Sequence, residues 1–355
     1  MGASVMNFWH GKNVLLTGHT GFKGSWLSLW LHSLGANCVG FSLEPSIKPN
    51  LFEITQISAT MDSIIGDIRN FELLQMTLHK YQPEIIIHLA AQPLVNFSYQ
   101  EPLITYSTNI IGIINLLEAA RSIDSVKAIV NVTSDKCYQN QELDRGYHET
   151  DSLGGYDPYS SSKACSELIT QAYSYSYLKN RGINIATARA GNVIGGGDWG
   201  KDRLVPDVVN ACIKQQNISL RYPNALRPWQ HVLEPLSAYL ILAKQLYESP
   251  PDYIQAWNFG PDEDQDKTVS WITDTLIKYW GSNIKWVQSL HPHEIETNLL
   301  RLNSIKANRA LGWECQWSIE KALAKTVEWY QSYYEEENMQ KITLAQIFEF
   351  QKNLV

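Results

Sequence analysis

Residues 13–35 read NVLLTGHTGFKGSWLSLWLHSLG, and this stretch decides the fold. Its first five residues are an apolar run that predicts a short buried strand. Three glycines follow at once: Gly18, Gly21 and Gly24. Apolar side chains at helical spacing come next and indicate a helix that ends at Gly35. A glycine-rich turn between a strand and a helix N-terminus offers N–H groups and positive potential to a pyrophosphate. The spacing is GxxGxxG and not GxGxxG, so the prediction of a dinucleotide-binding unit depends on the strand and helix around it.

Strands and helices continue to alternate as far as residue 190. Near-continuous apolar runs predict strands over 37–43, 63–68, 84–91, 128–134 and 183–190. Helices are expected over about 70–80, 104–121 and 158–180. Such strands are typical of a parallel sheet covered on both faces. Right-handed crossovers then give an α/β fold with a doubly wound parallel sheet of Rossmann type, whose ligand crevice lies at the carboxyl ends of the strands.

The pattern changes after Gly191, where glycines and prolines break the chain into short pieces. A further helix is predicted over 236–248 and is expected to pack back on the first part. We therefore expect a discontinuous division into an NAD-binding domain, a smaller α/β substrate domain and a C-terminal helical segment. Their expected ranges are 1–190 plus about 230–257 for the first, 191–229 plus about 258–330 for the second, and 331–355 for the third.

Composition excludes several classes of function. The 355 residues are 44% hydrophobic and 18% charged, as in globular proteins, and the net charge of −7 comes without a basic block. Nucleic acid is therefore not an expected partner. No apolar run is judged to reach the roughly 18 residues of a membrane span, so no membrane partner is expected. The five scattered cysteines predict reduced thiols in a cytoplasmic protein, and no metal site is expected.

Acid and base groups gather in two further motifs. Tyr159 and Lys163 in YSSSK lie at i and i+4, on one face of a predicted helix. The ammonium group is expected to lower the phenol pKa from about 10 toward neutrality, which makes a base. Ser134, Asp135 and Lys136 stand at the end of a predicted strand. Together these groups exceed what simple alcohol oxidation requires.

With these motifs in register, the chain resembles the extended short-chain dehydrogenase/reductase superfamily. Within it, longer strings resemble the CDP-glucose 4,6-dehydratases, a family of nucleotide-sugar dehydratases. The resemblance reaches about residue 330, and its most specific string is ARAGNVIGGGDW (188–199). The others are TGHTGFKG (17–24), AAQPLV (90–95), TSDKCY (133–138), GGYDPYS (154–160), RPWQHVLEPL (227–236), NFGP (258–261), HPHE (291–294) and LGW (311–313).

The resemblance implies dehydration of CDP-D-glucose to CDP-4-dehydro-6-deoxy-D-glucose with NAD as a bound cofactor. C4 is oxidised, water leaves across C5–C6, hydride returns to C6, and NAD is regenerated in each turnover. Tyr159, assisted by Lys163, is the expected base at the 4-hydroxyl. Related dTDP-glucose dehydratases carry Thr-Asp-Glu where this chain has Ser134, Asp135 and Lys136.

By this comparison Asp135 is the expected acid and Lys136 the expected C5 base. The two roles conflict in part, because a charged Lys136 lowers the pKa that an acid at Asp135 needs to be high. Lys136 could instead bind substrate or orient Asp135. Ser134 either bonds the 4-hydroxyl or is a satisfied strand-end hydroxyl.

The glycine turn, the strand ends and the resemblance together give the remaining site residues. Expected NAD contacts are Gly18, Thr20, Gly21, Phe22, Gly24, Ser42, Asp67, Ile68, Leu89, Ala90, Ala91, Thr108, Asn109, Val132, Tyr159 and Lys163. Expected contacts of CDP-D-glucose are Gln92, Asn96, Ser134, Asn192, Trp199, Arg203, Arg227 and His231.

Some of these residues have a second interpretation. Asp67 could be a strand-end cap, Arg203 a surface charge and Trp199 a core residue. His88 in a buried strand is more often a satisfied core histidine than a catalyst. Asn96 and Asn303 depart from the arginine and aspartate expected of the family.

Two other functions fit the same cofactor unit. A nucleotide-sugar 4-epimerase uses the same tyrosine, lysine and NAD but does not need Asp135 and Lys136. A non-catalytic NAD(H)-binding regulator tends to lose the tyrosine or the lysine, and both are present here. Superfamily members often pair through helices that correspond to 104–121 and 158–180, so a homodimer or homotetramer is expected.

Overall fold

The computed structural model describes residues 2–141, 143–262, 266–289 and 300–354. A parallel seven-stranded sheet forms its centre, in the order β11-β6-β5-β4-β1-β2-β3. These strands are β1 (Asn13–Thr17), β2 (Asn37–Ser42), β3 (Asp62–Ile65), β4 (Ile85–His88), β5 (Ala128–Val132), β6 (Asn184–Ala190) and β11 (Ala256–Phe259). The order reverses between β1 and β4, which is the doubly wound arrangement that the sequence predicts.

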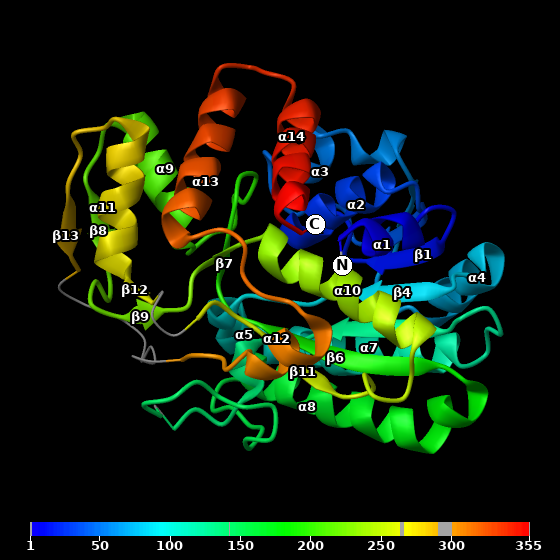
Figure 1. Cartoon of the computed structure of the whole chain (residues 1–355). Coiled ribbons are helices and arrows are strands. Elements are labelled where there is room, and N and C mark those ends of the chain that lie inside the picture. Colours follow the sequence, from blue (N-terminus) through cyan, green and yellow to red (C-terminus); the bar gives the residue numbers. More distant parts are fainter. Residues whose placement is uncertain (1, 142, 263–265, 290–299, 355) are drawn as a thin grey trace.

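Helices cover both faces of the sheet (Figure 1). On one side lie α2 (Phe22–Ser33), α10 (Leu233–Glu248), α1 (Gly2–Phe8) and α14 (Met339–Gln351). On the other lie α4 (Phe71–Tyr81), α7 (Gly112–Ala120) and α8 (Pro158–Tyr173). The apolar runs of the strands are buried because helices cover both faces of the sheet, as is usual for a parallel sheet.

Smaller elements complete the chain. The remaining helices are α3 (Leu51–Ile54), α5 (Val95–Gln100), α6 (Pro102–Tyr106), α9 (Leu204–Lys214), α11 (Val269–Trp280), α12 (Ile305–Leu311) and α13 (Ile319–Tyr334). Short strands pair as β7 (Val193–Ile194) with β10 (Gln230–His231), β9 (Leu226–Arg227) with β12 (Lys267–Thr268), and β8 (Ile218–Leu220) with β13 (Trp286–Gln288). Short helical turns are η1 (Ile57–Ala59), η2 (Ser107–Ile111), η3 (Asp135–Cys137), η4 (Ser174–Leu178), η5 (Lys179–Arg181) and η7 (Lys352–Leu354).

The register of the central strands brings their carboxyl ends to one edge. Thr17 is paired with His88, and His88 is paired with Asn131. The residues that follow β1, β4 and β5 therefore meet at the same edge of the sheet. These residues begin the glycine turn, the AAQPLV loop and the Ser134 turn, so the topology gathers the predicted site.

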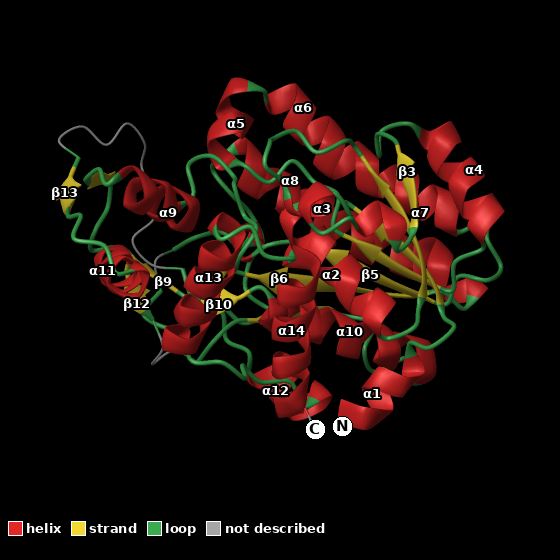
Figure 2. Ribbon diagram, turned by 90° about the horizontal axis from the view of Figure 1, so that it is seen from above, coloured by secondary structure: helices red, strands yellow, loops and turns green. Residues whose placement is uncertain are grey.

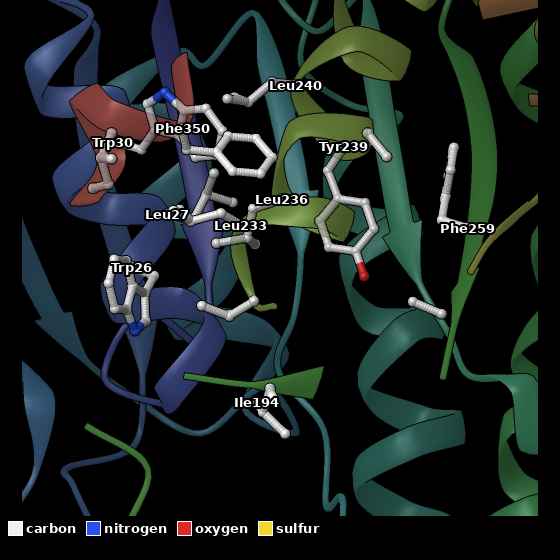
Figure 3. Close-up of a cluster of buried hydrophobic side chains, with 14 of the residues drawn as sticks. Trp26, Leu27, Trp30, Ile194, Leu233, Leu236, Tyr239, Leu240, Phe259 and Phe350 are labelled. Atoms are coloured by element: carbon white, nitrogen blue, oxygen red, sulfur yellow. The ribbon is translucent and has the colours of Figure 1, made fainter. Parts of the chain in front are cut away.

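Aromatic side chains fill the core between the sheet and the first helical layer. Trp26 and Trp30 of α2 lie close to α10 and α14 in this layer (Figure 3). The rings of Trp30 and Phe350 meet edge to face, with centroids 5.8 Å apart. Burying large aromatic surfaces is strongly favourable, and this contact holds the C-terminal helix α14 against α2.

The second part of the chain returns to the sheet in two places. Helix α10 packs on β5 and β6, as predicted, and β11 pairs with β6. The helices α9, α11 and α13 pack on one another to one side of the sheet (Figures 1 and 2). The expected boundary at about residue 330 falls inside the continuous helix α13. The division into two domains itself stays a proposal.

One helix departs from the expectation about membrane spans. The helical stretch Pro102–Ala120 has 19 residues and is long and apolar enough to cross a membrane, so the expectation that no apolar run reaches this length was wrong. Of its apolar window, 44% is buried inside the structure. Its parts contact α4 and α8, in the layer that covers the sheet. Length and composition alone are therefore weak evidence for a span here.

Candidate active site

The glycine turn after β1 is closed so tightly that side chains do not fit. Gly18 has φ +76°, and a Cβ there would lie 2.8 Å from the Ala90 nitrogen. A Cβ on Gly24 would lie 2.0 Å from the Gly18 carbonyl oxygen. Both positions require glycine, the first because L-residues rarely adopt that backbone conformation. The turn brings its backbone against Leu89 and Ala90 at the end of β4.

Helix α2 begins at this turn without a side-chain cap. Its N-cap residue is Gly21, and its first turn carries no acidic residue. The first amides of a helix have no intrahelical acceptor, and the dipole makes this end positive. An uncapped, glycine-lined helix start fits a pyrophosphate, so the residues present fit the dinucleotide that the sequence predicts.

The residues expected around the adenosine are held by local bonds. Thr20 Oγ1 lies 2.8 Å from Ser42 Oγ and donates to the Leu43 carbonyl oxygen. Asp67 accepts hydrogen bonds from the Arg69 guanidinium and from Arg69 N, which lower the pKa of its carboxyl group. The bond to Arg69 N matches the strand-end cap that the sequence left open for Asp67.

Apolar and helical neighbours complete this side of the turn. Ile68 is buried in the core against Gly112 and α7. Leu89, Ala90, Ala91 and Thr108 are half-buried, and Phe22 is half-buried at the start of α2. His88 is a core histidine as expected, since its Nδ1 lies 2.7 Å from Thr17 Oγ1 and burial lowers its pKa to about 3.

The Ser134-Asp135-Lys136 motif forms the short turn η3 directly after β5. Ser134 caps the turn by accepting from Lys136 N at 3.2 Å, and its hydroxyl donates to Asp135 Oδ1 at 2.9 Å. Asp135 is 4% exposed, and burial raises the pKa of its carboxyl group. Lys136 and the Ser134 hydrogen bond oppose the rise. Burial therefore outweighs the neighbouring cation, and Asp135 has the raised pKa that an acid requires.

Tyr159 and Lys163 lie in α8, across from this turn. Burial raises the pKa of Tyr159 to about 12, although a hydrogen bond with the Ser134 side chain opposes the rise. The expected fall toward neutrality was wrong, because burial of the phenol outweighs the Ser134 hydrogen bond and the Arg203 cation that lower its pKa. Burial also lowers the pKa of Lys163 to about 8, and its ammonium group donates to the Val132 carbonyl oxygen at 3.3 Å.

Asn109 ties two of the predicted segments together. Its amide accepts from Gln92 N at 2.8 Å and donates to the Gln92 carbonyl oxygen and to Ser162 Oγ at 2.9 Å. Ser162 precedes Lys163, so Asn109 holds the helix near the lysine, as the sequence predicts. The side chain of Gln92 bonds to Leu94 and Thr105. Its amide is thus engaged inside the loop that was expected to contact substrate.

Several of the expected substrate contacts lie near this pocket. Arg203 forms an ion pair with Asp198 at 2.8 Å. The Lys23 ammonium group is an electrostatic neighbour of both Arg203 and Lys163. The Tyr159 phenol is also an electrostatic neighbour of Arg203. Arg203 is thus an electrostatic neighbour of the site, although its side chain is 35% exposed, and its contact with substrate stays a prediction.

Arg227 and Asn96 extend the same side of the site. Arg227 is 7% exposed, and its charge reaches the Asp135 carboxyl group. Asn96 Nδ2 lies 3.5 Å from Asp202 Oδ2, so the AAQPLV loop touches the segment before α9. Asn192 is half-buried, and its carbonyl oxygen accepts from Gln230 N. Asn303 Oδ1 accepts from Ile305 N at the start of α12, which is a structural role.

Two expected substrate contacts lie in aromatic clusters. The ring of Trp199 packs against Trp329, Tyr330 and Tyr333 of α13, which matches its interpretation as a packing residue. His231 is fully buried, and its ring lies 4.8 Å from that of Trp317 and 5.8 Å from that of Trp26. The expectation of a substrate contact at His231 was wrong, because tryptophans close its ring off from the site.

Sequence reasoning missed residues around this pocket. Lys23 in the first turn of α2 is an electrostatic neighbour of Lys163 and Asp135, and burial lowers its pKa to about 8. Its place inside the glycine turn could have pointed to it. Glu167 and Arg189, discussed below, form a buried pair beside Lys163. The described residues hold no group of three or more His, Cys, Asp or Glu side chains suited to a metal. The HPHE motif lies outside them.

Comparisons with known proteins show the family of the chain. The model of the GDP-mannose 4,6 dehydratase family matches residues 15–326. A CDP-glucose 4,6-dehydratase of Salmonella typhimurium is 46% identical over 338 residues, which cover 94% of each chain.

Solved structures show the same fold. A UDP-glucose 4-epimerase of Thermotoga maritima has a TM-score of 0.80 at 23% identity, covering 91% of this chain and 99% of that one. A dTDP-glucose 4,6-dehydratase of Streptomyces venezuelae, solved with NAD and TYD bound, has a TM-score of 0.77 at 23% identity, covering 92% and 99%. Epimerase and dehydratase share this fold, so the fold alone does not separate them. By the family match and the 46% relative, the chain belongs to the GDP-mannose 4,6-dehydratase family of nucleotide-sugar enzymes and is a homologue of CDP-glucose 4,6-dehydratase.

Proposed function

We propose that this protein converts CDP-D-glucose to CDP-4-dehydro-6-deoxy-D-glucose with NAD as a bound cofactor. The observation that carries the proposal is that two sets of groups meet at the carboxyl ends of the central strands. Tyr159 and Lys163 suit oxidation of a hydroxyl, and Asp135 and Lys136 suit loss of water. Cytosine in the substrate rests on the 46% identical relative, whose name states CDP-glucose.

The first half of the reaction removes hydrogen from C4. Tyr159 is the base that we assign to the 4-hydroxyl, and the Ser134 hydroxyl bonded to it orients this exchange. Because burial raises the pKa of the phenol, its ionised form has to be stabilised by positive charge in the loaded site. Lys163, held at the Val132 carbonyl oxygen, places a positive charge beside the reacting groups. The glycine turn would hold NAD, which would supply the hydride acceptor for C4 and the hydride donor for C6.

The second half removes water across C5 and C6. The new C4 ketone makes the C5 proton acidic, and Lys136 is the base that we assign to it. A proton returns to C5 when C6 receives the hydride. Asp135 gives a proton to the leaving 6-hydroxyl, a role that its raised pKa supports because more of the carboxyl group is protonated.

A 4-epimerase is the nearest alternative and shares the fold. Epimerisation removes and returns hydride at C4 only and needs no acid at C6. The buried, raised-pKa carboxyl of Asp135 therefore favours dehydration. A non-catalytic regulator is disfavoured because Ser134, Tyr159 and Lys163 are all present and gathered in one place.

We also propose a homodimer, or a tetramer built from it, in the cytoplasm. Large apolar side chains lie exposed along α6, α8 and their extensions: Leu103, Ile104, Tyr106, Ile111, Leu168, Tyr175 and Tyr177. Their number on one pair of helices suits a contact between copies. The cysteines are all free thiols, which suits a reducing compartment. Light scattering of the purified protein tests the assembly, and a monomer at micromolar concentration would refute it.

The proposed reaction is tested by incubating the protein with CDP-glucose and catalytic NAD. Mass spectrometry should show loss of one water, and NMR should show a C6 methyl group and a C4 ketone. UDP-glucose and dTDP-glucose serve as matched substrates that differ in the base. Equal turnover of all three would refute cytosine selectivity, and formation of CDP-galactose without water loss would refute dehydration.

A further inference from the structure

A fully buried ion pair lies behind the catalytic residues. Glu167 of α8 and Arg189 of β6 are 4% and 3% exposed, and Arg189 Nη2 lies 2.7 Å from Glu167 Oε2. Glu167 follows Lys163 by one helical turn, so it sits on the same face of α8. The carboxylate also raises the pKa of Lys163, against the effect of burial. The pair is thus an electrostatic neighbour of the site although neither side chain belongs to the reaction.

Glu167 connects α8 to the two strands that end at the site. Its Oε1 accepts a short hydrogen bond from Thr133 Oγ1, and its Oε2 accepts from Thr187 Oγ1 at 2.7 Å. Thr133 immediately precedes Ser134. The carboxylate therefore fixes the distance between the helix that carries Tyr159 and the strand that leads into the Ser134 turn.

Arg189 connects the same pair to the far side of that turn. Its Nη1 donates to the Tyr138 hydroxyl at 2.7 Å, and its guanidinium lies 4.8 Å from the Tyr138 ring centroid. Tyr138 comes directly after η3, the turn that holds Asp135 and Lys136. Glu167 and Arg189 are thus hydrogen-bonded to both ends of the turn. Glu167 bonds to Thr133 before it, and Arg189 bonds to Tyr138 after it.

Tyr138 carries the connection on to the second part of the chain. Its hydroxyl donates to Asn258 Oδ1 at 2.7 Å, and Asn258 Nδ2 donates to the Tyr147 carbonyl oxygen at 2.7 Å. The rings of Tyr138 and Tyr147 are stacked with centroids 5.0 Å apart. One hydroxyl therefore joins the guanidinium of β6 to the end of β11.

Burying two opposite charges is not a general means of stabilising a fold. The desolvation cost of such a pair can exceed the attraction between the charges, and apolar replacements are often as stable. Here the carboxylate oxygens and an Nη atom of the buried pair are also bonded to Thr133, Thr187 and Tyr138, and such bonds fix the relative position of the segments that carry these residues. Positions of acid and base groups within a fraction of an ångström decide reaction rates.

We propose that Glu167, Arg189 and Tyr138 form a brace that holds the dehydration groups of η3 in register with the oxidation groups of α8. This proposal rests on the proposed function, since it assigns the two half-reactions to the two elements. These three are positioning residues and touch no substrate. Loosening the Tyr138 end should move η3 while α8 stays held by Glu167, so water loss should slow more than C4 oxidation.

The test compares wild type with Tyr138→Phe in a single turnover. Phenylalanine keeps the ring stack on Tyr147 and loses only the hydroxyl that Arg189 and Asn258 share. NADH absorbance reports oxidation at C4, and quenched samples report the 4-keto sugar and the dehydrated product. A lost hydrogen bond in a buried network corresponds to about tenfold in rate, so water loss should slow by about that factor and NADH should accumulate.

The matched control is Tyr247→Phe. The Tyr247 hydroxyl also bonds to a charged pair, Lys12 and Glu84, but these residues flank the amino ends of β1 and β4. This variant should keep the wild-type ratio of the two steps. It removes a tyrosine hydroxyl that bonds to charged groups, as the test variant does, so it separates a local effect on η3 from general loosening.

A second variant guards against a folding failure of Tyr138→Phe. Arg189→Lys keeps a positive charge beside Glu167 but cannot also reach the Tyr138 hydroxyl as the forked guanidinium does. It should show the same excess slowing of water loss. The brace is refuted if the ratio of the rate of C4 oxidation to the rate of water loss in folded variants equals the wild-type ratio. Failure of wild type itself to convert CDP-glucose would refute the proposed function instead.

Discussion

The Ser134 hydroxyl donates a 2.9 Å hydrogen bond to Asp135 Oδ1, and the same side chain is bonded to Tyr159. One serine thus links the base of the first half-reaction to the acid of the second. The arrangement follows from the end of β5, where the chain turns into η3 and is capped by that serine. Two chemistries can then act on one sugar without a large movement of the protein.

Asp135→Asn should separate the two halves. Asparagine keeps the size of the side chain but cannot give an acid proton, so oxidation at C4 should survive and water loss should slow by about a hundredfold or more. NADH and the 4-keto sugar should accumulate in a single turnover, as followed by absorbance and mass spectrometry. If both steps fall equally, Asp135 only positions substrate.

Lys136→Met tests the base that acts at C5. Methionine has a similar length and no charge, so the packing of this half-buried side chain should change little. We expect the variant to oxidise C4 but to lose exchange of the C5 proton with deuterated solvent. Retained exchange would assign the base elsewhere and leave Lys136 as a substrate-binding or Asp135-orienting residue. NMR of the recovered sugar measures it.

The charge of Lys163 predicts an alkaline limit of activity. Burial lowers its pKa to about 8, so the cation is present below this pH and is lost as the pH rises through it. Glu167 and Cys137 face this ammonium group and raise its pKa, and Lys23 and His88 are also its electrostatic neighbours. The rate should therefore fall above about pH 8.

Glu167→Gln gives the matched comparison for this limit. Removing the negative charge takes away a contribution that raises the pKa of Lys163, so the fall in rate should move to lower pH. The pH dependence of kcat/KM, measured for wild type and variant in the same buffers, checks the sign. An unmoved alkaline limb would mean that Lys163 does not set it.

Gly24→Ala should weaken cofactor binding. The added Cβ would lie 2.0 Å from the Gly18 carbonyl oxygen, so the turn must open. Gly11→Ala is the control, because it has a positive φ but no atom within 4 Å of the added Cβ, which leaves only backbone strain. Titration with NAD by intrinsic fluorescence should show weaker binding in the first variant and unchanged binding in the second. Equal affinity in both would remove the turn from the cofactor site.

Local patterns predicted the parts of this molecule that local physics determines. The strand, glycine turn and helix of residues 13–35 are confirmed. The sequence could predict them because the tight turn leaves no space for a side chain at Gly18 and Gly24, and only glycine fits there. The gathering of Ser134 and Tyr159 followed from the parallel topology. The pKa of Tyr159 did not, because it depends on burial by segments distant in the chain.

Long-range packing also explains the other errors. His231 lies in the motif RPWQHVLEPL (227–236), beside polar residues. In the fold its ring packs against Trp26 and Trp317, which are far apart in sequence. Arg189 lies in the motif ARAGNVIGGGDW (188–199), but its ion pair with Glu167 was not predicted from the sequence. A glutamate one turn after Lys163, on the buried face of α8, was the available signal.

The most direct measurement of the central claim follows one hydrogen atom. CDP-glucose deuterated at C4 is converted in ordinary water with catalytic NAD, and the product is examined by NMR and mass spectrometry. The account predicts that the deuterium leaves C4 and is found in the C6 methyl group, with a ketone at C4 and one water lost. Deuterium retained at C4 in an epimerised sugar would contradict it.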